Sequence, residues 1–411
     1  MPRLMNVALT TIGSRGDIQP YIALGVALRK NGYSVSVLTH PWAKEIVGSY
    51  GLEHVSIGED INIHHAARQF VENSSSQLKE FKYALNFIFD TLRNCHNDLL
   101  LAIKHVDLVI GHGIVGEAEA EMLGRPFITV SIAPMGLQKV YWKSPNVLKE
   151  SGVFIADKLM GAVFGKPYRR FRKDIGLNPK RSASKHPYLA LIPMPLFLQK
   201  PNPNWKDATQ ITGFFFAETP DGYVPPKDLL HFLQSGEKPI LITFGSMFHN
   251  HEQMKNLFLT ICDATTRSTS RAILMMPDLS QEQIQTPDHI YLAGSIPYSW
   301  LLKHVTLVVH HFGFGTTAEV LKAGLPSIPI PHIFDQKTRA SEICKLGYTC
   351  KPLQIDKING HTLADAIIQT QTNQELKKKC DDAGRMISSE KGTQKAVELI
   401  DKYVGQIQWP G

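Results

Sequence analysis

The chain has 411 residues, which favours two or three domains because one domain usually takes about 100–200 residues. Its 43% hydrophobic and 20% charged residues are typical of a soluble globular protein, and no apolar run approaches the ~18–20 residues that cross a bilayer. The net charge of +7 is moderate, and no nucleic-acid-binding motif accompanies it, so a nucleic-acid partner is not expected.

The N-terminal residues and the cysteines both favour a cytoplasmic protein. The segment MPRLMNVALTTIG is followed by Gly-Ser-Arg-Gly-Asp instead of a small-residue cleavage site, so we interpret it as a first strand and not as a signal peptide. The five cysteines are scattered and form no Cys-x-x-Cys pair, which indicates neither a disulfide framework nor a zinc site. A reducing compartment fits this cysteine usage best.

In the first half, short apolar strands alternate with helical patterns, as in parallel α/β units. A helix is predicted over 19–32, with Pro20 near its start and Gly32 just past its end. Two apolar insertions, 61–104 and 135–175, are interpreted either as core or as housing for an apolar substrate. The predicted strands are 6–12, 34–38, 107–111, 127–131 and 188–192.

Five basic residues lie within 166–173, and we call this stretch the basic patch. It is either a solvated helix face or a surface that attracts an anionic membrane or an acidic ligand. Its members are Lys166, Arg169, Arg170, Arg172 and Lys173.

Proline-rich segments at 193–205 and 217–228 mark a boundary, after which a second series of strands begins. The predicted fold class is therefore α/β, with two Rossmann-like halves facing each other across a cleft and ligands outside the carboxyl ends of the strands. The predicted strands of the second half are 239–245, 272–276, 290–294, 306–310 and 327–331. The predicted domains are 1–215, a linker at 216–235, 236–390, and a C-terminal helix at 391–411 that packs back on the first domain.

The segment 11-TIGSRGDIQP-20 joins the first strand to the first helix. Gly13 and Gly16 allow a tight turn, and a helix N-terminus presents free N–H groups to an anion. The spacing is not Gly-x-Gly-x-x-Gly, which disfavours a nicotinamide cofactor. Asp17 either caps the helix or acts as a general base at the strand end.

Three polar segments follow strands of the second half. In 242-ITFGSM-247, Ser246 caps the next helix or donates to a phosphate. In 310-HHFGFGTT-317, the glycines open a helix whose N–H groups, threonines and histidine suit a diphosphate, while Thr316 and Glu319 also fit a capping box. The pair Asp335-Gln336 suits vicinal sugar hydroxyls. Together they predict a nucleotide-sugar site.

These motifs resemble those of the inverting nucleotide-sugar glycosyltransferases of the GT-B fold, above all the sterol glucosyltransferases and the glycopeptide-antibiotic glycosyltransferases. The similar segments are 13-GSRGD-17, 244-FGS-246, 296-IPYSWL-301, 310-HHFGFGTT-317 and 335-DQ-336, in family order over essentially the whole chain. The chain differs from the family at Phe312 and Phe314, which replace smaller residues, and at Tyr298, which replaces a histidine. Membrane-targeting domains like those that precede the fungal sterol enzymes are not expected, and the chain resembles a bacterial single-unit enzyme.

The resemblance implies a role for each matched position. Asp17 would be the general base, and His311 would contact the donor diphosphate. The other donor-binding positions would be Ser14 and Arg15 near the donor, Ser246 on the phosphate side, Ser295 and Ile296 framing the base, Gly313, Phe314, Gly315 and Thr316 at the diphosphate, and Asp335 and Gln336 on the sugar hydroxyls.

The expected reaction is an inverting transfer of a hexose, glucose from UDP-glucose, to a hydroxyl of a hydrophobic sterol or lipid. No cofactor and no metal is expected, since the chain has no Asp-x-Asp motif. The protein would be cytoplasmic, with peripheral membrane contact through the basic patch. The alternatives are a TDP- or UDP-sugar transferase acting on a polyketide, antibiotic or phenolic aglycone, a UDP-sugar epimerase, and an inactive sugar-nucleotide-binding protein.

Overall fold

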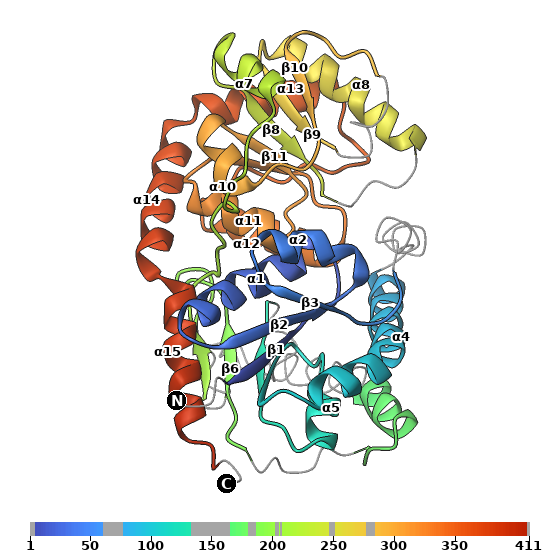
Figure 1. Cartoon of the computed structure of the whole chain (residues 1–411). Coiled ribbons are helices and arrows are strands. Elements are labelled where there is room, and N and C mark those ends of the chain that lie inside the picture. The colour runs from blue at the N-terminus through green and yellow to red at the C-terminus, as the bar shows by residue number, and fades with distance from the viewer. Residues whose placement is uncertain are drawn as a thin grey trace, which may run out of the picture. The chain divides into compact units, whose positions relative to one another are not determined.

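A computed structural model describes residues 5–60, 77–132, 165–179, 186–201, 205, 208–245, 251–276 and 284–408. The chain divides into two compact units, which are described separately. The first unit comprises Met1–Ile61, Leu78–Ala217 and Glu390–Gly411, and the second comprises Asn62–Gln77 and Glu218–Ser389. Figure 1 shows the elements of both units, many of them labelled. In the described part of the chain, no helix is both long and apolar enough to span a membrane.

The first unit is built on a seven-stranded sheet of order β3-β2-β1-β4-β5-β6-β7, in which every pairing is parallel. All five strands predicted in this half are confirmed, and the two unpredicted strands, β3 and β7, lie at the two edges. The strands are β1 Asn6–Thr10, β2 Ser34–Thr39, β3 Glu53–Ser56, β4 Leu108–His112, β5 Phe127–Val130, β6 Ala190–Ile192 and β7 Thr209–Ile211.

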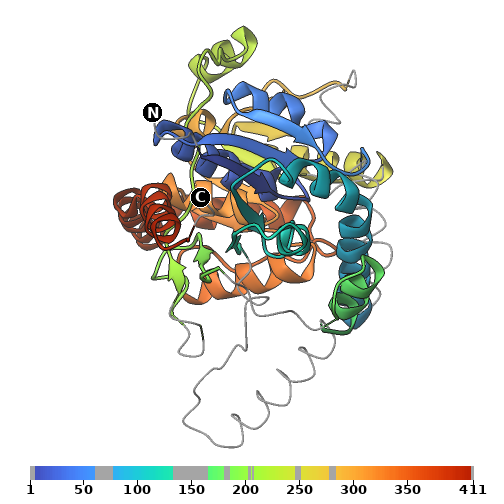
Figure 2. The same cartoon turned by 60° about the horizontal axis from the view of Figure 1, so that its bottom comes forward.

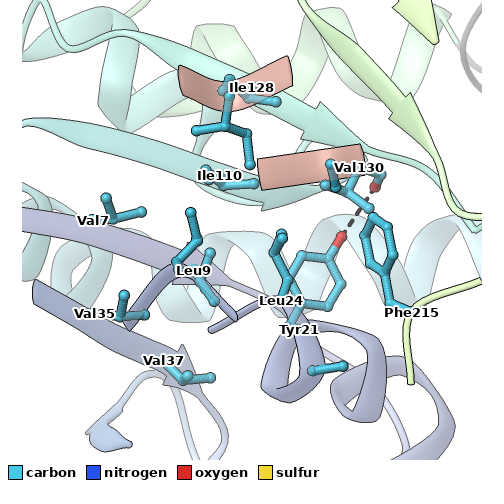
Figure 3. Close-up of a cluster of buried hydrophobic side chains, with 14 of the residues drawn as sticks. Val7, Leu9, Tyr21, Leu24, Val35, Val37, Ile110, Ile128, Val130 and Phe215 are labelled. Atoms are coloured by element: carbon cyan, nitrogen blue, oxygen red, sulfur yellow. Dashed lines mark hydrogen bonds between the residues drawn. The ribbon is translucent and has the colours of Figure 1, made fainter. Parts of the chain in front are cut away.

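Helix α1 (Arg15–Lys30) covers one face of this sheet and forms the centre of its core. Tyr21 of α1 is fully buried, and its hydroxyl donates to the carbonyl of Val130 at 3.0 Å (Figure 3). The C-terminal helix α15 (Gly392–Gly405) lies beside α1 and adds Ile400 and Tyr403 to the same core. The shorter helices of this unit are η1 Pro41–Ala43, α2 Lys44–Ser49 and α5 Glu117–Met122.

A second core cluster of this unit lies around α4 (Gln77–Ile103), which forms much of the first apolar insertion, 61–104. Figures 1 and 2 both show a helix at 165–174, coloured green, lying along α4, and the Phe89 and Phe171 rings are 6.0 Å apart between centroids. The rest of the second apolar insertion, up to residue 164, lies outside the described residues.

Arg172 corrects the expectation for the basic patch. Its side chain is fully buried, and its guanidinium donates to both carboxylate oxygens of Glu121, at 2.8 and 2.9 Å. It also donates to the carbonyl of Asn178 at 2.8 Å. Arg172 therefore faces inward because its charge is paired there, and only the other four members of the basic patch are exposed: Lys166, Arg169, Arg170 and Lys173.

The second unit is built on a five-stranded parallel sheet of order β10-β9-β8-β11-β12. All its strands were predicted. They are β8 Ile240–Thr243, β9 Ala272–Met275, β10 Ile290–Ala293, β11 Val308–His310 and β12 Ser327–Pro329. The helices are α7 Lys227–Gln234, α8 His251–Arg267, α10 Tyr298–Leu301, η3 Leu302–His304, α11 Phe314–Lys322, α12 Phe334–Lys345, α13 Gly360–Thr372 and α14 Gln374–Glu390.

Two helix starts differ from the prediction. Helix α1 begins at Arg15 and not at residue 19, with Ser14 as its N-cap, so Pro20 lies inside the helix. Helix α11 begins at Phe314 with Gly313 as its N-cap, which makes the capping box of Thr316 and Glu319 wrong. Both helices begin earlier because a residue of the preceding turn, Ser14 or Gly313, already has the extended backbone of an N-cap.

Candidate functional site

In the first unit, Asp17 lies in the first turn of α1, directly after the carboxyl end of β1. Its Oδ2 accepts from the backbone N–H of Ser14 at 2.7 Å and from the Ser14 hydroxyl at 2.9 Å. Gly13 has a φ of +123°, and a Cβ on it would lie 2.5 Å from Oδ2 of Asp17. The turn therefore requires glycine, and Ser14 fixes the carboxylate. Arg15, the first residue of α1, is exposed.

His112 lies beside this turn and was not predicted as a site residue. It ends β4, which pairs with β1, and its Nδ1 is 3.3 Å from the Thr11 hydroxyl. Its ring contacts Tyr21 at 5.6 Å between centroids. Burial lowers the pKa of His112, and the nearby carboxylate of Asp17 opposes that shift. A neutral imidazole therefore lies within electrostatic reach of Asp17. The sequence feature that could have identified His112 as a site residue is its position at the carboxyl end of a predicted strand.

In the second unit, the register places the carboxyl ends of three neighbouring strands together. His310, the last residue of β11, pairs with Thr243 of β8 on one side and Pro329 of β12 on the other. The segments that follow these strands therefore all leave the sheet at its carboxyl edge. They contain Gly245, His311 and His332.

His311 is buried between two glycines. A Cβ on Gly245 would lie 3.0 Å from Cε1 of His311, and a Cβ on Gly313 would overlap Nε2. Burial lowers the pKa of His311 to about 4, with a further contribution from the cation of Arg339. Its Nδ1 is buried and has no hydrogen-bond partner among the described residues. His311 is therefore neutral at pH 7, although a hydrogen bond with the backbone of Thr243 opposes this lowering of its pKa.

Helix α11 begins beside His311. The backbone N–H groups of Gly315 and Thr316, in its first turn, have no partner within the helix, and such groups attract anions. The Thr316 hydroxyl lies 3.5 Å from that of Tyr298, which in turn is 3.2 Å from the Thr243 hydroxyl. Tyr298 thus links the end of β8 to the first turn of α11, a connection that the sequence did not predict.

The two phenylalanines of the turn have different environments. Phe312 is 1% exposed and its ring stacks on His310, with 4.5 Å between centroids and 21° between planes. Its backbone has a φ of +65°, which is uncommon for a bulky residue. The Phe314 ring is partly exposed and lies 5.7 Å from the guanidinium carbon of Arg339. The bulk of Phe312 therefore fills the core and does not project from the turn.

Asp335 and Gln336 lie in the first turn of α12, after the carboxyl end of β12. The Asp335 side chain is half exposed and forms an ion pair with Arg339 at 3.4 Å. Gln336 is buried, and its Oε1 accepts from the backbone N–H groups of His332 and Ile333 at 2.9 and 3.3 Å. Asp335 is thus open to a ligand, while the oxygen of Gln336 is used to hold the turn that precedes α12.

The remaining predicted positions divide between exposed, buried and undescribed residues. Ser295 is exposed after β10, and Ile296 is buried in the core of the second unit. Ser246 lies outside the described residues. Glu319, one turn into α11, is half-buried, and this burial raises the pKa of its carboxyl to about 7. In the described part of the chain, no cluster of three or more His, Cys, Asp or Glu side chains could hold a metal ion.

Two family models match the chain, one in each half. Residues 7–111 match the glycosyltransferase family 28 N-terminal domain. Residues 260–401 match the C-terminal domain described as erythromycin biosynthesis protein CIII-like.

Similar proteins span the whole chain. A sterol 3-beta-glucosyltransferase from Pichia angusta is 29% identical over 95% of the chain, but the chain spans only 33% of that protein's length. The O-mycaminosyltylonolide 6-deoxyallosyltransferase of Streptomyces fradiae is 28% identical over 97% of both chains. The structure of the Streptomyces sp. SF2575 glycosyltransferase SsfS6, complexed with thymidine diphosphate, matches with a TM-score of 0.69 and 16% identity, covering 97% of this chain and 99% of that one.

Proposed function

The chain is a GT-B glycosyltransferase related to sterol glucosyltransferases and antibiotic glycosyltransferases, and we propose that it moves glucose from UDP-glucose to a hydroxyl of a hydrophobic acceptor such as a sterol or lipid. The observation that carries this proposal is the environment of His311. A neutral, buried imidazole lies between two glycines that leave no room for a side chain, beside the N-terminus of α11.

The second unit would bind the donor. The first-turn N–H groups of α11 and the imidazole of His311 would donate hydrogen bonds to the diphosphate and stabilise its charge as it leaves. The half-exposed carboxylate of Asp335, on the neighbouring strand end, would accept hydrogen bonds from sugar hydroxyls. Ser295 and Ile296 would frame the base, and Ser246 would add a phosphate-side hydroxyl.

The first unit would supply the general base. Two donors from Ser14 hold Oδ2 of Asp17, while in the described part of the chain no group donates to Oδ1. We infer that Oδ1 takes the proton of the acceptor hydroxyl as the oxygen attacks the anomeric carbon of the sugar. The C–O bond to the diphosphate breaks on the opposite side, so the anomeric configuration inverts.

The acceptor class rests on similarity and on the surface charge. Sterol 3-beta-glucosyltransferases are among the similar proteins, although the chain spans only 33% and 29% of two of them. Lys166, Arg169, Arg170 and Lys173, the exposed members of the basic patch, would attract an anionic membrane surface where such an acceptor is dissolved. A lipid-like alcohol is therefore our first candidate.

A second candidate is transfer of a TDP-linked sugar to a polyketide or other antibiotic aglycone. It is favoured by the S. fradiae transferase, which matches over 97% of its own length, and by the thymidine diphosphate complex of SsfS6. Only the donor base and the acceptor distinguish this candidate from the first.

The test is a matrix of donors against acceptors. UDP- and TDP-glucose are incubated with sterols, lipid alcohols, macrolide aglycones and phenols, and the nucleotide diphosphate and the glycoside are both quantified. UDP release that depends on a sterol or lipid supports the first candidate, and TDP release with a macrolide supports the second. Donor conversion without an acceptor would indicate an epimerase or hydrolase, and nucleotide binding with no conversion of any donor would indicate a binding protein.

A further inference from the structure

Arg339 in α12 contacts three segments of the candidate donor site. Its Nη1 donates to the carbonyl of Phe312 at 2.8 Å, and its guanidinium forms an ion pair with Asp335 at 3.4 Å. Its guanidinium carbon also lies 5.7 Å from the centre of the Phe314 ring. The Arg339 side chain is only 17% exposed, so its hydrogen bond to Phe312 is partly buried, whereas the ion pair with the half-exposed Asp335 is open to solvent.

The contact with Phe312 is made where the backbone is strained. Phe312 has a φ of +65°, a conformation that is unfavourable for a bulky residue and persists only where its surroundings hold it. Three contacts hold it: its ring stacks on His310, its backbone N–H donates to Nδ1 of His310 at 3.3 Å, and its carbonyl accepts from Arg339. This turn carries His311 on one side and the N-cap Gly313 on the other, so its geometry decides where both groups lie.

The contact with Asp335 links this turn to the next strand end. Asp335 and Arg339 are four residues apart in α12 and therefore lie on the same face of the helix. The same guanidinium that holds the β11–α11 turn thus also holds the carboxylate assigned to the sugar hydroxyls. Its cation is also near enough to lower the pKa values of both His310 and His311.

We propose that Arg339 is a positioning residue that fixes the turn at Phe312 and the carboxylate of Asp335 relative to each other, so that the diphosphate and the sugar of the donor are bound in one geometry. This inference rests on the proposed function, because it assigns a purpose to contacts within that donor site. It also accounts for the two phenylalanines: Phe312 requires the hydrogen bond to its carbonyl, and Phe314 provides the ring beside the cation.

The experiment compares Arg339→Gln and Arg339→Lys with Arg267→Gln. Arg267 is a matched control because it forms an exposed i,i+4 ion pair with Asp263 in α8, at 2.8 Å, in the same unit. Affinities for UDP and for UDP-glucose are measured by calorimetry, and transfer is measured with the acceptor identified in the donor–acceptor screen. The pKa of His311 is followed by NMR in each variant.

Arg339→Gln is expected to lower kcat/KM for transfer by about 10- to 100-fold, because a misplaced donor loses that much in rate. The same variant should weaken the binding of UDP-glucose more than the binding of UDP, since the contact between Asp335 and the sugar is loosened. It should also raise the pKa of His311, because a nearby cation is removed. Arg339→Lys keeps the charge and should recover part of the transfer. Arg267→Gln should match the wild type in all readouts.

A double-mutant cycle with Phe312→Gly tests the backbone part of the proposal. Glycine adopts a φ of +65° without strain, so Arg339→Gln should cost less transfer in that background than in the wild type. Equal costs in the two backgrounds, or an Arg339→Gln variant with unchanged donor affinity and an unchanged His311 pKa, would overturn the inference alone. A wild-type protein that binds no nucleotide diphosphate would instead overturn the proposed function, together with the inference that rests on it.

Discussion

Oδ2 of Asp17 accepts two hydrogen bonds from Ser14, one from the backbone N–H at 2.7 Å and one from the hydroxyl at 2.9 Å. Ser14 and not Asp17 is the N-cap of α1, and Asp17 closes the capping box from the third position of the helix, which leaves Oδ1 for the proposed role as general base. The cap fixes the direction of Oδ1.

Asp17→Asn is expected to fold and to bind the donor nucleotide, but to lose about 10²–10⁴-fold in transfer rate, as is usual when a positioned general base is removed. The asparagine oxygen still accepts from the Ser14 backbone, so the first turn of α1 survives. Transfer kinetics and nucleotide calorimetry on the same preparation check this. Ser14→Ala is the control for the cap: it removes one hydrogen bond to Asp17 and should cost about 0.5–2 kcal/mol of stability with only a modest loss of rate. Near-wild-type turnover in Asp17→Asn would refute the assignment.

Gly313→Ala is expected to weaken UDP binding by about tenfold or more. The backbone at Gly313, with φ −61° and ψ 152°, suits alanine, so the effect arises because the new Cβ overlaps Nε2 of His311 and displaces the ring. The loss of one hydrogen bond to a charged group corresponds to about 1.5–3 kcal/mol. Calorimetric titration with UDP measures it.

Gly48→Ala provides the comparison for Gly313→Ala. Gly48 lies in α2 with no atom within 4 Å of a Cβ, so alanine there should leave UDP binding unchanged and slightly stabilise the helix. Unaltered UDP affinity in Gly313→Ala would mean that His311 does not contact the nucleotide.

Stability should fall on acidification because His311 is buried in its neutral form. The pKa of His311 is about 4 in the folded chain and 6.5 for an ordinary histidine. Between these two pH values, His311 is protonated in the unfolded chain and neutral in the folded chain. The free energy of unfolding therefore decreases as the pH falls from about 6.5 to about 4, and this contribution is fully present above pH 6.5. Thermal or denaturant unfolding at several pH values should give a shallower acid-side slope for His311→Gln than for the wild type. Parallel slopes would contradict the burial of a neutral imidazole.

Arg172→Gln should destabilise the first unit by up to about 3–5 kcal/mol, because it leaves Glu121 without its bidentate partner. The partial exposure of Glu121, 25% of its side chain, makes the lower end of this range the better expectation. Arg170→Gln, two residues away but 79% exposed, should change stability by less than about 0.5 kcal/mol.

In a vesicle-binding assay, we expect the substitution of Arg170 to have a larger effect than the substitution of Arg172, the reverse of their effects on stability. If the basic patch contacts anionic lipid, Arg170→Gln should weaken sedimentation with phosphatidylserine vesicles, whereas Arg172→Gln should not do so at temperatures where it is folded. Equal behaviour of the two variants in both assays would contradict the inward placement of Arg172.

Much of the fold could be predicted because it depends on local patterns. Each of the ten predicted strands is a short apolar run bounded by polar residues, and such a run specifies a buried parallel strand without knowledge of its neighbours. The edge strands β3 (Glu53–Ser56) and β7 (Thr209–Ile211) were missed because their residues are largely polar and only partly buried. The helix starts were placed late because the N-cap depends on the backbone of the preceding turn, as Gly313 demonstrates.

The sequence by itself determined the motifs and their order, the parallel α/β class and the resemblance to glycosyltransferases, because each motif and each strand is a short run of neighbouring residues. Only the tertiary structure decided which side chains meet: His112 with the turn of Asp17, Tyr298 between Thr243 and Thr316, and Arg339 with the carbonyl of Phe312. These contacts depend on the strand order and register, which bring together residues from separate strand ends. For this reason Arg172, one of five basic residues in a short stretch, could be recognised as a buried partner of Glu121 only when helix 165–174 was seen against α5.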